Sequence, residues 1–172
     1  MSDDEKEGGF DNLGKFAWEV VKANRPKVNV SADYVNAIPK GAEWNDLTAP
    51  AGTNYQKWKW LGPGLILHDF EFVMQLSWTY GARYRGGGAY ITNATVTVND
   101  YDVGIGGYDI DISCRIGNIE NFGSERAPIP AIPIDVTLKW SNWLSAGGGT
   151  NRFKVYGHGD YSAYYDDDSY EP

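Results

Sequence analysis

The sequence has only one cysteine, Cys114, and only two histidines among its 172 residues. A single cysteine excludes an intramolecular disulfide framework and a cysteine-rich zinc site. No apolar run approaches the roughly 20 residues that a membrane-spanning helix needs. The first residues are acidic, where a secretory signal is basic and then apolar. These absences predict synthesis in the cytoplasm without a signal peptide, and release by lysis or by a non-classical route stays open.

Basic residues are outnumbered by acidic ones. The 15 Lys and Arg residues against 23 Asp and Glu give a formal net charge of −8. A phosphate backbone would repel such a protein, so we expect no nucleic acid partner. The sequence also lacks a G-x-S-x-G nucleophile elbow and a Walker-type phosphate loop. We therefore expect a protein that is not an enzyme and that uses no cofactor.

Two acidic patterns resemble functional sites but fit them poorly. Residues 109–120 have the acidic outline of an EF-hand calcium loop, but Cys114 occupies the position that needs glycine for the sharp turn. Asp69 and Glu71 lie two residues apart on one expected strand, at roughly 7 Å, a distance that an acid–base pair can use. Acids are common on exposed strand faces, so we expect neither catalytic nor metal-binding residues here.

The composition favours strands over helices. Hydrophobic residues make up 42% of the chain, enough for a core, and 11 Val and 11 Ile stand against 8 Leu. β-branched side chains fit a pleated sheet better than a helix. The 21 Gly and 8 Pro supply frequent turns. The length fits one domain, so we expect one all-β domain over residues 10–159.

The N-terminal part is expected to differ from the rest. Residues 1–9 are charged and predict a flexible acidic tail. Apolar residues then follow at close to helical spacing, with Asn24, Arg25 and Pro26 as a stop, which predicts one short helix over residues 12–24. Gly14 weakens this prediction, and residues 16–21 also fit a strand.

A long β-hairpin is the clearest pattern in the sequence. Residues 66–80 alternate apolar and polar side chains, the glycine-rich segment 81–88 reverses the chain, and residues 89–98 alternate again. Further strands are expected at 28–34, 55–61, 101–105, 108–116, 132–143 and 152–156.

About seven or eight strands with one apolar face each predict an antiparallel β-sandwich. The proline-rich run 128–133 cannot donate a full ladder of hydrogen bonds, so we expect an edge strand or a connection there. Residues 160–172 are rich in Asp and Tyr without periodicity and predict a second acidic tail.

Aromatic residues are the distinctive feature, at 15% of the chain with 7 Trp and 12 Tyr. Several fall in expected loops or tips, and two arginines flank one of them. Flat aromatic faces beside guanidinium groups suit sugar rings and lipid headgroups. The candidate ligand-binding residues are Trp44, Arg83, Tyr84, Arg85, Tyr101 and Trp143. Folding of these loops back over the ends of the sandwich explains them equally well.

Three functions remain, in this order. The first is a non-catalytic, lectin-like binding protein that recognises carbohydrate or lipid headgroups through the six candidate residues. The second is a membrane-active, pore-forming-like oligomer, since both arms of the hairpin reach the 9 to 11 alternating residues of a transmembrane strand. The third is a self-assembling structural subunit. The expected partner is therefore a carbohydrate or a membrane surface, or a second copy of the chain in a homo-oligomer.

Overall fold

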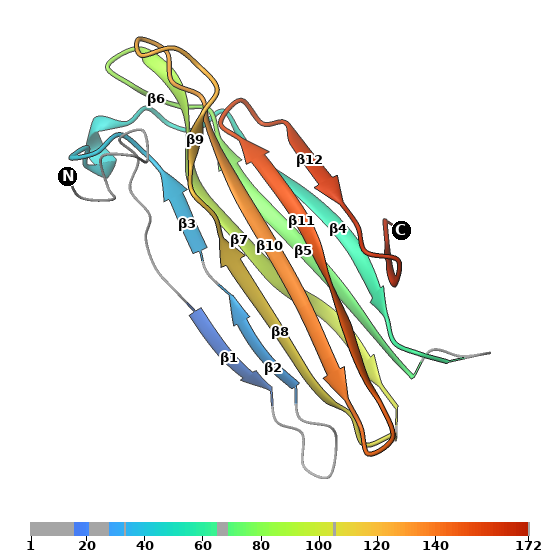
Figure 1. Ribbon diagram of the computed structural model, residues 1–172. Helices are drawn as coiled ribbons and strands as arrows, with labels where there is room; N and C mark the ends of the chain where they lie inside the picture. Colours follow the sequence, from blue (N-terminus) through green and yellow to red (C-terminus); the bar gives the residue numbers. More distant parts are fainter. Residues whose placement is uncertain (1–15, 21–27, 33, 65–68, 105, 172) are drawn as a thin grey trace, which may run out of the picture.

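The computed structural model describes residues 16–20, 28–32, 34–64, 69–104 and 106–171. Its side chains are described from Val35 onward, except that of Trp44. These residues are 65% strand and form two sheets packed face to face, which confirms the β-sandwich. The sandwich is elongated, and its long strands run nearly from one end to the other (Figure 1).

The first sheet has the strand order β1-β2-β8-β10-β11-β12, with β9 beside β10. The pairs are antiparallel except β2 with β8, which is parallel. In chain order its strands are β1 (Phe16–Val20), β2 (Val28–Ala32), β8 (Asp109–Ile116), β9 (Glu120–Asn121), β10 (Pro130–Ser141), β11 (Ala146–Tyr156) and β12 (Tyr161–Tyr164).

The second sheet has the order β13-β4-β5-β7-β3, with β6 beside β7, and all its pairs are antiparallel. Its strands are β3 (Tyr34–Ala37), β4 (Gly52–Leu61), β5 (Phe70–Tyr80), β6 (Ala82–Tyr84), β7 (Gly87–Val103) and β13 (Ser169–Tyr170). A short 3-10 helix, η2 (Trp44–Asp46), precedes β4.

The predicted hairpin is confirmed and forms the centre of the second sheet. Strands β5 and β7 pair from Phe70 with Val103 to Thr79 with Asn93. The strand expected at 101–105 is not separate: residues up to Val103 continue β7 past a bulge opposite Val73 and Met74. Residues 66–68 of the predicted hairpin lie outside the described residues.

The apolar side of the hairpin lies in the core. Alternate residues of β5 are at most 1% exposed and face the equally buried alternate residues of β10. The buried residues of these two strands are Phe70, Phe72, Met74, Leu76, Trp78, Ile132, Ile134, Val136 and Leu138. The alternation of apolar and polar residues in the sequence therefore reflects the burial of one face of each sheet against the other.

The predicted N-terminal helix is wrong for the part that the structure describes. Residues 16–20 form strand β1, which pairs with β2, and residues 12–15 and 21–24 lie outside the described part. Spacing over five residues is compatible with either structure, and pairing with β2 satisfies the backbone of this short segment. The expected tail at residues 1–9 also lies outside the described residues.

The proline-rich run is a connection only at residues 128–129, and residues 130–133 belong to a strand inside the sheet. Pro130 and Pro133 begin β10, which has β8 or β9 on one side and β11 on the other. Proline cannot donate a hydrogen bond but can accept one. The carbonyl oxygen of Pro130 accepts from Gly157, and that of Pro133 accepts from Gly117. Pro130 is also the first residue of its strand, where proline is tolerated.

The acidic C-terminal segment is paired, in contrast to the expected tail. Strand β12 extends the first sheet beside β11, and β13 extends the second sheet beside β4. Residues 161–170, the C-terminal strap, thus connect the two sheets along one side of the sandwich (Figure 1). On another side the chain also changes sheets, between β2 and β3.

Candidate functional site

The six candidate residues from the sequence do not gather at one place. Arg83, Tyr84 and Arg85 lie at the β6–β7 turn, and η2 with Trp44 lies at the same end of the sandwich (Figure 1). Tyr101 and Trp143 belong to the opposite end, where β10 turns into β11. The predicted single cluster of loop aromatics is therefore wrong in its geometry.

The β6–β7 turn has an unusual backbone. Tyr84 pairs with Gly87, so Arg85 and Gly86 form a two-residue turn with φ of 49° and 79°. Both values lie in the left-handed region that a type I′ turn requires. The guanidinium of Arg85 lies over the Tyr84 ring, 4.9 Å from its centroid. The guanidinium group of Arg85 therefore already contacts an aromatic ring of its own hairpin.

Tyr101 packs into the core. Its ring stacks on Phe72, with centroids 5.7 Å apart and an interplanar angle of 14°. This contact explains the position of an aromatic residue near the end of β7 without any ligand. Trp143 differs from it because its side chain is 84% exposed.

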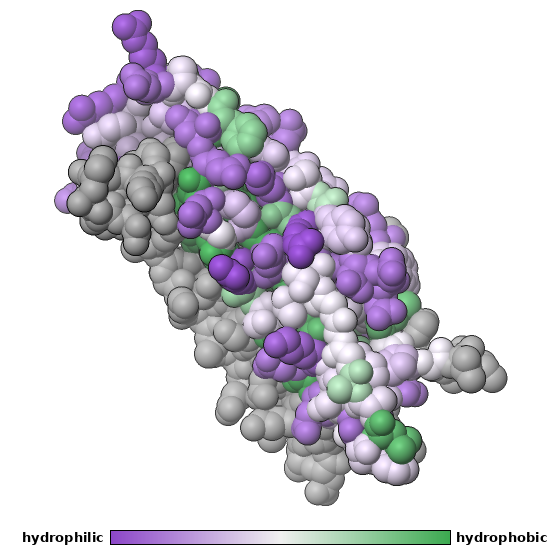
Figure 2. All heavy atoms as spheres, in the orientation of Figure 1, coloured by the Kyte–Doolittle hydropathy of each residue, from purple (hydrophilic) through white to green (hydrophobic). Residues whose placement is uncertain are grey.

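The turn between β10 and β11 presents two neighbouring apolar side chains to solvent. Residues 142–145, here called the tip, contain Trp143 and Leu144, and Leu144 is 71% exposed. A view coloured by hydropathy shows an isolated apolar patch at the lower end of the molecule, where this turn lies (Figures 1 and 2). Two adjacent exposed apolar side chains form a small apolar patch, and exposed apolar patches are candidate contact sites.

The tip is held in a defined conformation by Asn142. Its Oδ1 accepts hydrogen bonds from Leu144 N at 2.9 Å and from Ser145 N at 2.8 Å. The backbone N–H of Asn142 donates to the Ser145 carbonyl at 2.8 Å. This is an Asx-type turn, in which a side-chain oxygen replaces backbone partners. The exposure of the two apolar residues is therefore built into the turn.

The interior beneath the tip is closely packed. Phe70, Tyr108 and Trp140 meet edge to face, with ring centroids 5.5 to 6.3 Å apart. The hydroxyl of Tyr108 donates to Asp69 Oδ2. This bond, followed by burial, raises the pKa of Tyr108, while a hydrogen bond to the Asn142 side chain opposes the rise. Asn142 therefore connects the tip to this aromatic group.

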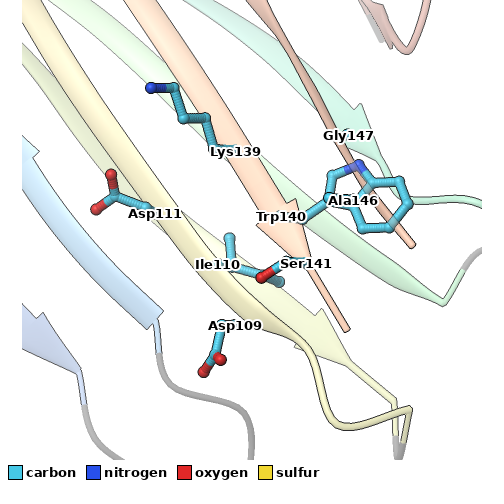
Figure 3. Close-up of a pocket in the computed structure, with 8 residues that line it drawn as sticks. All are labelled: Asp109, Ile110, Asp111, Lys139, Trp140, Ser141, Ala146 and Gly147. Atoms are coloured by element: carbon cyan, nitrogen blue, oxygen red, sulfur yellow. The ribbon is translucent and has the colours of Figure 1, made fainter. Parts of the chain in front are cut away.

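A hollow of about 500 Å³ adjoins the tip and is lined by the ends of β8, β10 and β11 that lie next to it. Its polar side chains are Asp109 and Asp111 from β8 and Lys139 and Ser141 from β10. They are cross-strand neighbours, since Asp111 pairs with Lys139 and Asp109 with Ser141. Figure 3 shows Lys139 and Trp140 leaving β10 on opposite sides, so Lys139 belongs to the hollow and the indole to the interior.

Small residues on β11 keep the hollow open. Ala146 lies opposite Ser141, and Gly148 lies opposite Lys139. Ala146 and Gly147 are the residues of β11 that line the hollow, whereas a Cβ atom at Gly148 would meet the carbonyl oxygen of Leu138. Among the described residues, none of the four polar side chains of the hollow has a hydrogen-bond or ion-pair partner.

The other residues considered for chemistry have separate roles. Asp69 accepts from Tyr108, and Glu71 forms an ion pair with Lys59 at 2.8 Å. Exposed His158 pairs with Asp160 at 2.9 Å. His68 lies outside the described residues. Within the described part of the chain, no three His, Cys, Asp or Glu side chains are grouped to hold a metal ion.

Sequence reasoning identified Trp143 but missed its neighbours. Leu144 was one apolar residue among many, and the role of Asn142 depends on the turn that β10 and β11 form. The polar residues of the hollow come from strands that are about 30 residues apart along the chain. The alternation of β8 did predict that Asp109 and Asp111 point outward, and both are exposed.

Comparison with protein-family models, with curated proteins and with solved structures found no match to this chain. In the described residues, no helix has the length and apolar character needed to cross a membrane.

Proposed function

We propose that this protein is a non-catalytic binding protein that attaches reversibly to neutral lipid surfaces through the tip. The observation that carries the proposal is the joint exposure of Trp143 and Leu144 on a turn held by Asn142. Tryptophan favours the boundary between lipid headgroups and acyl chains, because its ring is apolar and its N–H is polar. Leucine beside it adds apolar area that a lipid surface can cover.

The energy of this contact favours reversible attachment. Full burial of one large apolar side chain is worth about 1.5–3 kcal/mol, so the two residues give about 3–6 kcal/mol before the costs of association. Even a single myristoyl chain gives only marginal membrane binding, and stable anchoring takes two contributions. The tip alone therefore supports weak binding that a second contact has to strengthen.

Charge at the same end selects against anionic lipids. Asp100, Asp102, Asp109 and Asp111 are exposed here, and the whole chain carries a formal net charge of −8. A bilayer rich in anionic lipids has a negative surface potential that repels such a surface. The partner that fits both the apolar tip and its acidic surroundings is a membrane with neutral headgroups.

The membrane-insertion hypothesis depends on the hairpin at 66–98. The described part of this hairpin forms the centre of the second sheet. The apolar side of β5 is in the core, where Phe72, Met74 and Leu76 have no exposure at all. Insertion of this hairpin would require the two sheets to separate. The tip needs no such rearrangement, so we prefer surface attachment to pore formation.

Vesicle co-sedimentation tests the proposal. The wild-type protein should bind vesicles of phosphatidylcholine, and the double variant Trp143→Ala, Leu144→Ala should bind at least about tenfold more weakly, the equivalent of 1.4 kcal/mol. Tyr164→Ala is the matched control, because Tyr164 is 64% exposed on β12, away from the tip. Addition of phosphatidylserine should weaken binding, and salt should partly reverse this effect.

Two results would refute surface attachment by the tip. One is the absence of wild-type binding to phosphatidylcholine vesicles. The other is equal binding by the wild-type protein and the double variant, with both proteins folded by circular dichroism.

A further inference from the structure

The hollow lies beside the tip, where a second contact with the same lipid surface can form. Ser141 and Ala146, which line it, are the residues that directly precede and follow the tip. Any surface that covers Trp143 and Leu144 therefore brings its headgroups next to the hollow. The volume of about 500 Å³ lies within the 300–1,000 Å³ typical of small-molecule sites.

The side chains of the hollow offer both donors and acceptors. Asp109 and Asp111 supply four carboxylate oxygens that accept hydrogen bonds, and Lys139 supplies an ammonium group that donates them. The hydroxyl of Ser141 can do both. Within the described part of the chain, no residue forms an ion pair with these side chains.

This mixture of groups favours one class of headgroup. Two carboxylates against one ammonium give the hollow an excess of negative charge, which disfavours phosphate and sulfate groups. The ammonium of Lys139, in turn, disfavours a second cation such as choline. An uncharged polyhydroxyl ring satisfies both kinds of group, because each sugar hydroxyl donates to a carboxylate or accepts from an ammonium.

We infer that the hollow binds the neutral sugar headgroup of a glycolipid whose membrane is contacted by the tip. This inference rests on the proposed function, since the tip brings the hollow to the lipid surface. The indole of Trp143, exposed beside the hollow, can pack against the apolar C–H face of the same sugar. The tip and the hollow then supply the two contributions that stable attachment takes.

Vesicles of phosphatidylcholine with and without 10 mol% of a monohexosylceramide test the inference. Two to three new hydrogen bonds predict that the glycolipid strengthens wild-type binding by about tenfold. The double variant Asp111→Ala, Lys139→Ala should lose this increment, measured relative to its own binding to pure phosphatidylcholine. Asp135→Ala is the matched control, because Asp135 lies on the outer face of β10 but does not line the hollow.

Two further measurements distinguish recognition of the neutral sugar from other causes of stronger binding. A free methyl hexoside at millimolar concentration should compete with the glycolipid increment, and a sulfated hexosylceramide should give a smaller increment than the neutral lipid.

Equal binding with and without the neutral glycolipid would overturn the inference. So would an increment that persists in the Asp111→Ala, Lys139→Ala protein. In both cases binding to pure phosphatidylcholine that depends on Trp143 would still stand, so the failure of the hollow is distinguishable from failure of the tip.

Discussion

At the scale of single residues, Asn142 determines whether the tip is presented as a fixed unit. Its Oδ1 accepts three hydrogen bonds within the turn, from Leu144 N, Ser145 N and Ser145 Oγ. Its side chain also contacts the hydroxyl of Tyr108 in the interior. A tip without these bonds would have to be ordered on binding, and that ordering costs free energy.

We expect Asn142→Ala to weaken binding to phosphatidylcholine vesicles by about three- to tenfold, because ordering an immobilised side chain or loop costs about 0.5–1.5 kcal/mol per group. Asn142→Asp keeps the acceptor oxygen that forms the turn and should restore most of the binding. Co-sedimentation measures both variants. Equal loss in the Ala and Asp variants would show that the turn geometry has no part in attachment.

Single residues also show where the prediction of the binding site from the sequence failed. An aromatic residue in an expected loop predicted Trp143 correctly as exposed, but the same reasoning failed for Tyr101. The bulge in β7 opposite Val73 and Met74 sets the register that places Tyr101 on Phe72. The sequence pattern does not locate that bulge, so the inward position of Tyr101 could not be predicted.

At the scale of elements, the C-terminal strap covers buried polar and aromatic groups between β4 and β11. Asn151 is fully buried, and its Oδ1 accepts from Asp166 N at 2.8 Å and from Ser169 Oγ at 2.7 Å. Tyr165 packs edge to face on Phe153, and its hydroxyl accepts from Gln56 Nε2 at 3.1 Å. The strap is therefore packed against the core through Tyr165 and Ser169 and is not an appended tail.

Burial raises the pKa of Tyr165 from 10.0 to about 12, with smaller increases from the charges of Glu171 and Tyr161 and an opposing effect of the Gln56 hydrogen bond. The folded state thus favours the protonated hydroxyl. The stabilisation from this group is complete below pH 10 and is lost as the pH rises from 10 to 12.

We expect the urea midpoint to fall more steeply between pH 10 and 12 in the wild-type protein than in Tyr165→Phe, which has no hydroxyl to ionise. Denaturation at pH 9, 10 and 11 measures this difference and removes the contribution of the other tyrosines, which both proteins share. Parallel pH dependence in the two proteins would contradict a buried Tyr165 hydroxyl.

Elements with clear alternation could be predicted from the sequence, and those without it could not. The long hairpin follows from period-two patterning, because one side of β5 is entirely buried. Strand β12 lacks this signal, since all four of its residues are exposed and only its backbone pairs with β11. Strand β1 has too few residues for its spacing to separate helix from strand.

At the scale of the whole molecule, the two sheets approach each other closely at Gly157. Its N–H donates to the Pro130 carbonyl of the first sheet, and its carbonyl accepts from Gly81 N beside the second sheet. A Cβ atom at this position would overlap the carbonyl oxygen of Ala89. Only a residue without a side chain fits between these two backbones.

We expect Gly157→Ala to reduce the free energy of unfolding by about 2–4 kcal/mol, because backbone atoms of both sheets would have to shift. Gly52→Ala is the control: its added methyl would meet only the Tyr80 side chain, with the hydroxyl oxygen nearest at 3.2 Å. Urea denaturation monitored by tryptophan fluorescence compares the variants. A change below about 0.5 kcal/mol in Gly157→Ala would show that the sheets do not meet tightly there.

The proposed lipid contact lies at one extremity of the elongated sandwich. Strand β10 runs for 12 residues from the opposite end of the sandwich to the tip, which corresponds to roughly 40 Å. A protein attached through the tip and the neighbouring hollow would cover little membrane area. The turn with Arg85, at the opposite end of the sandwich, would then be the part of the described chain farthest from the lipid surface.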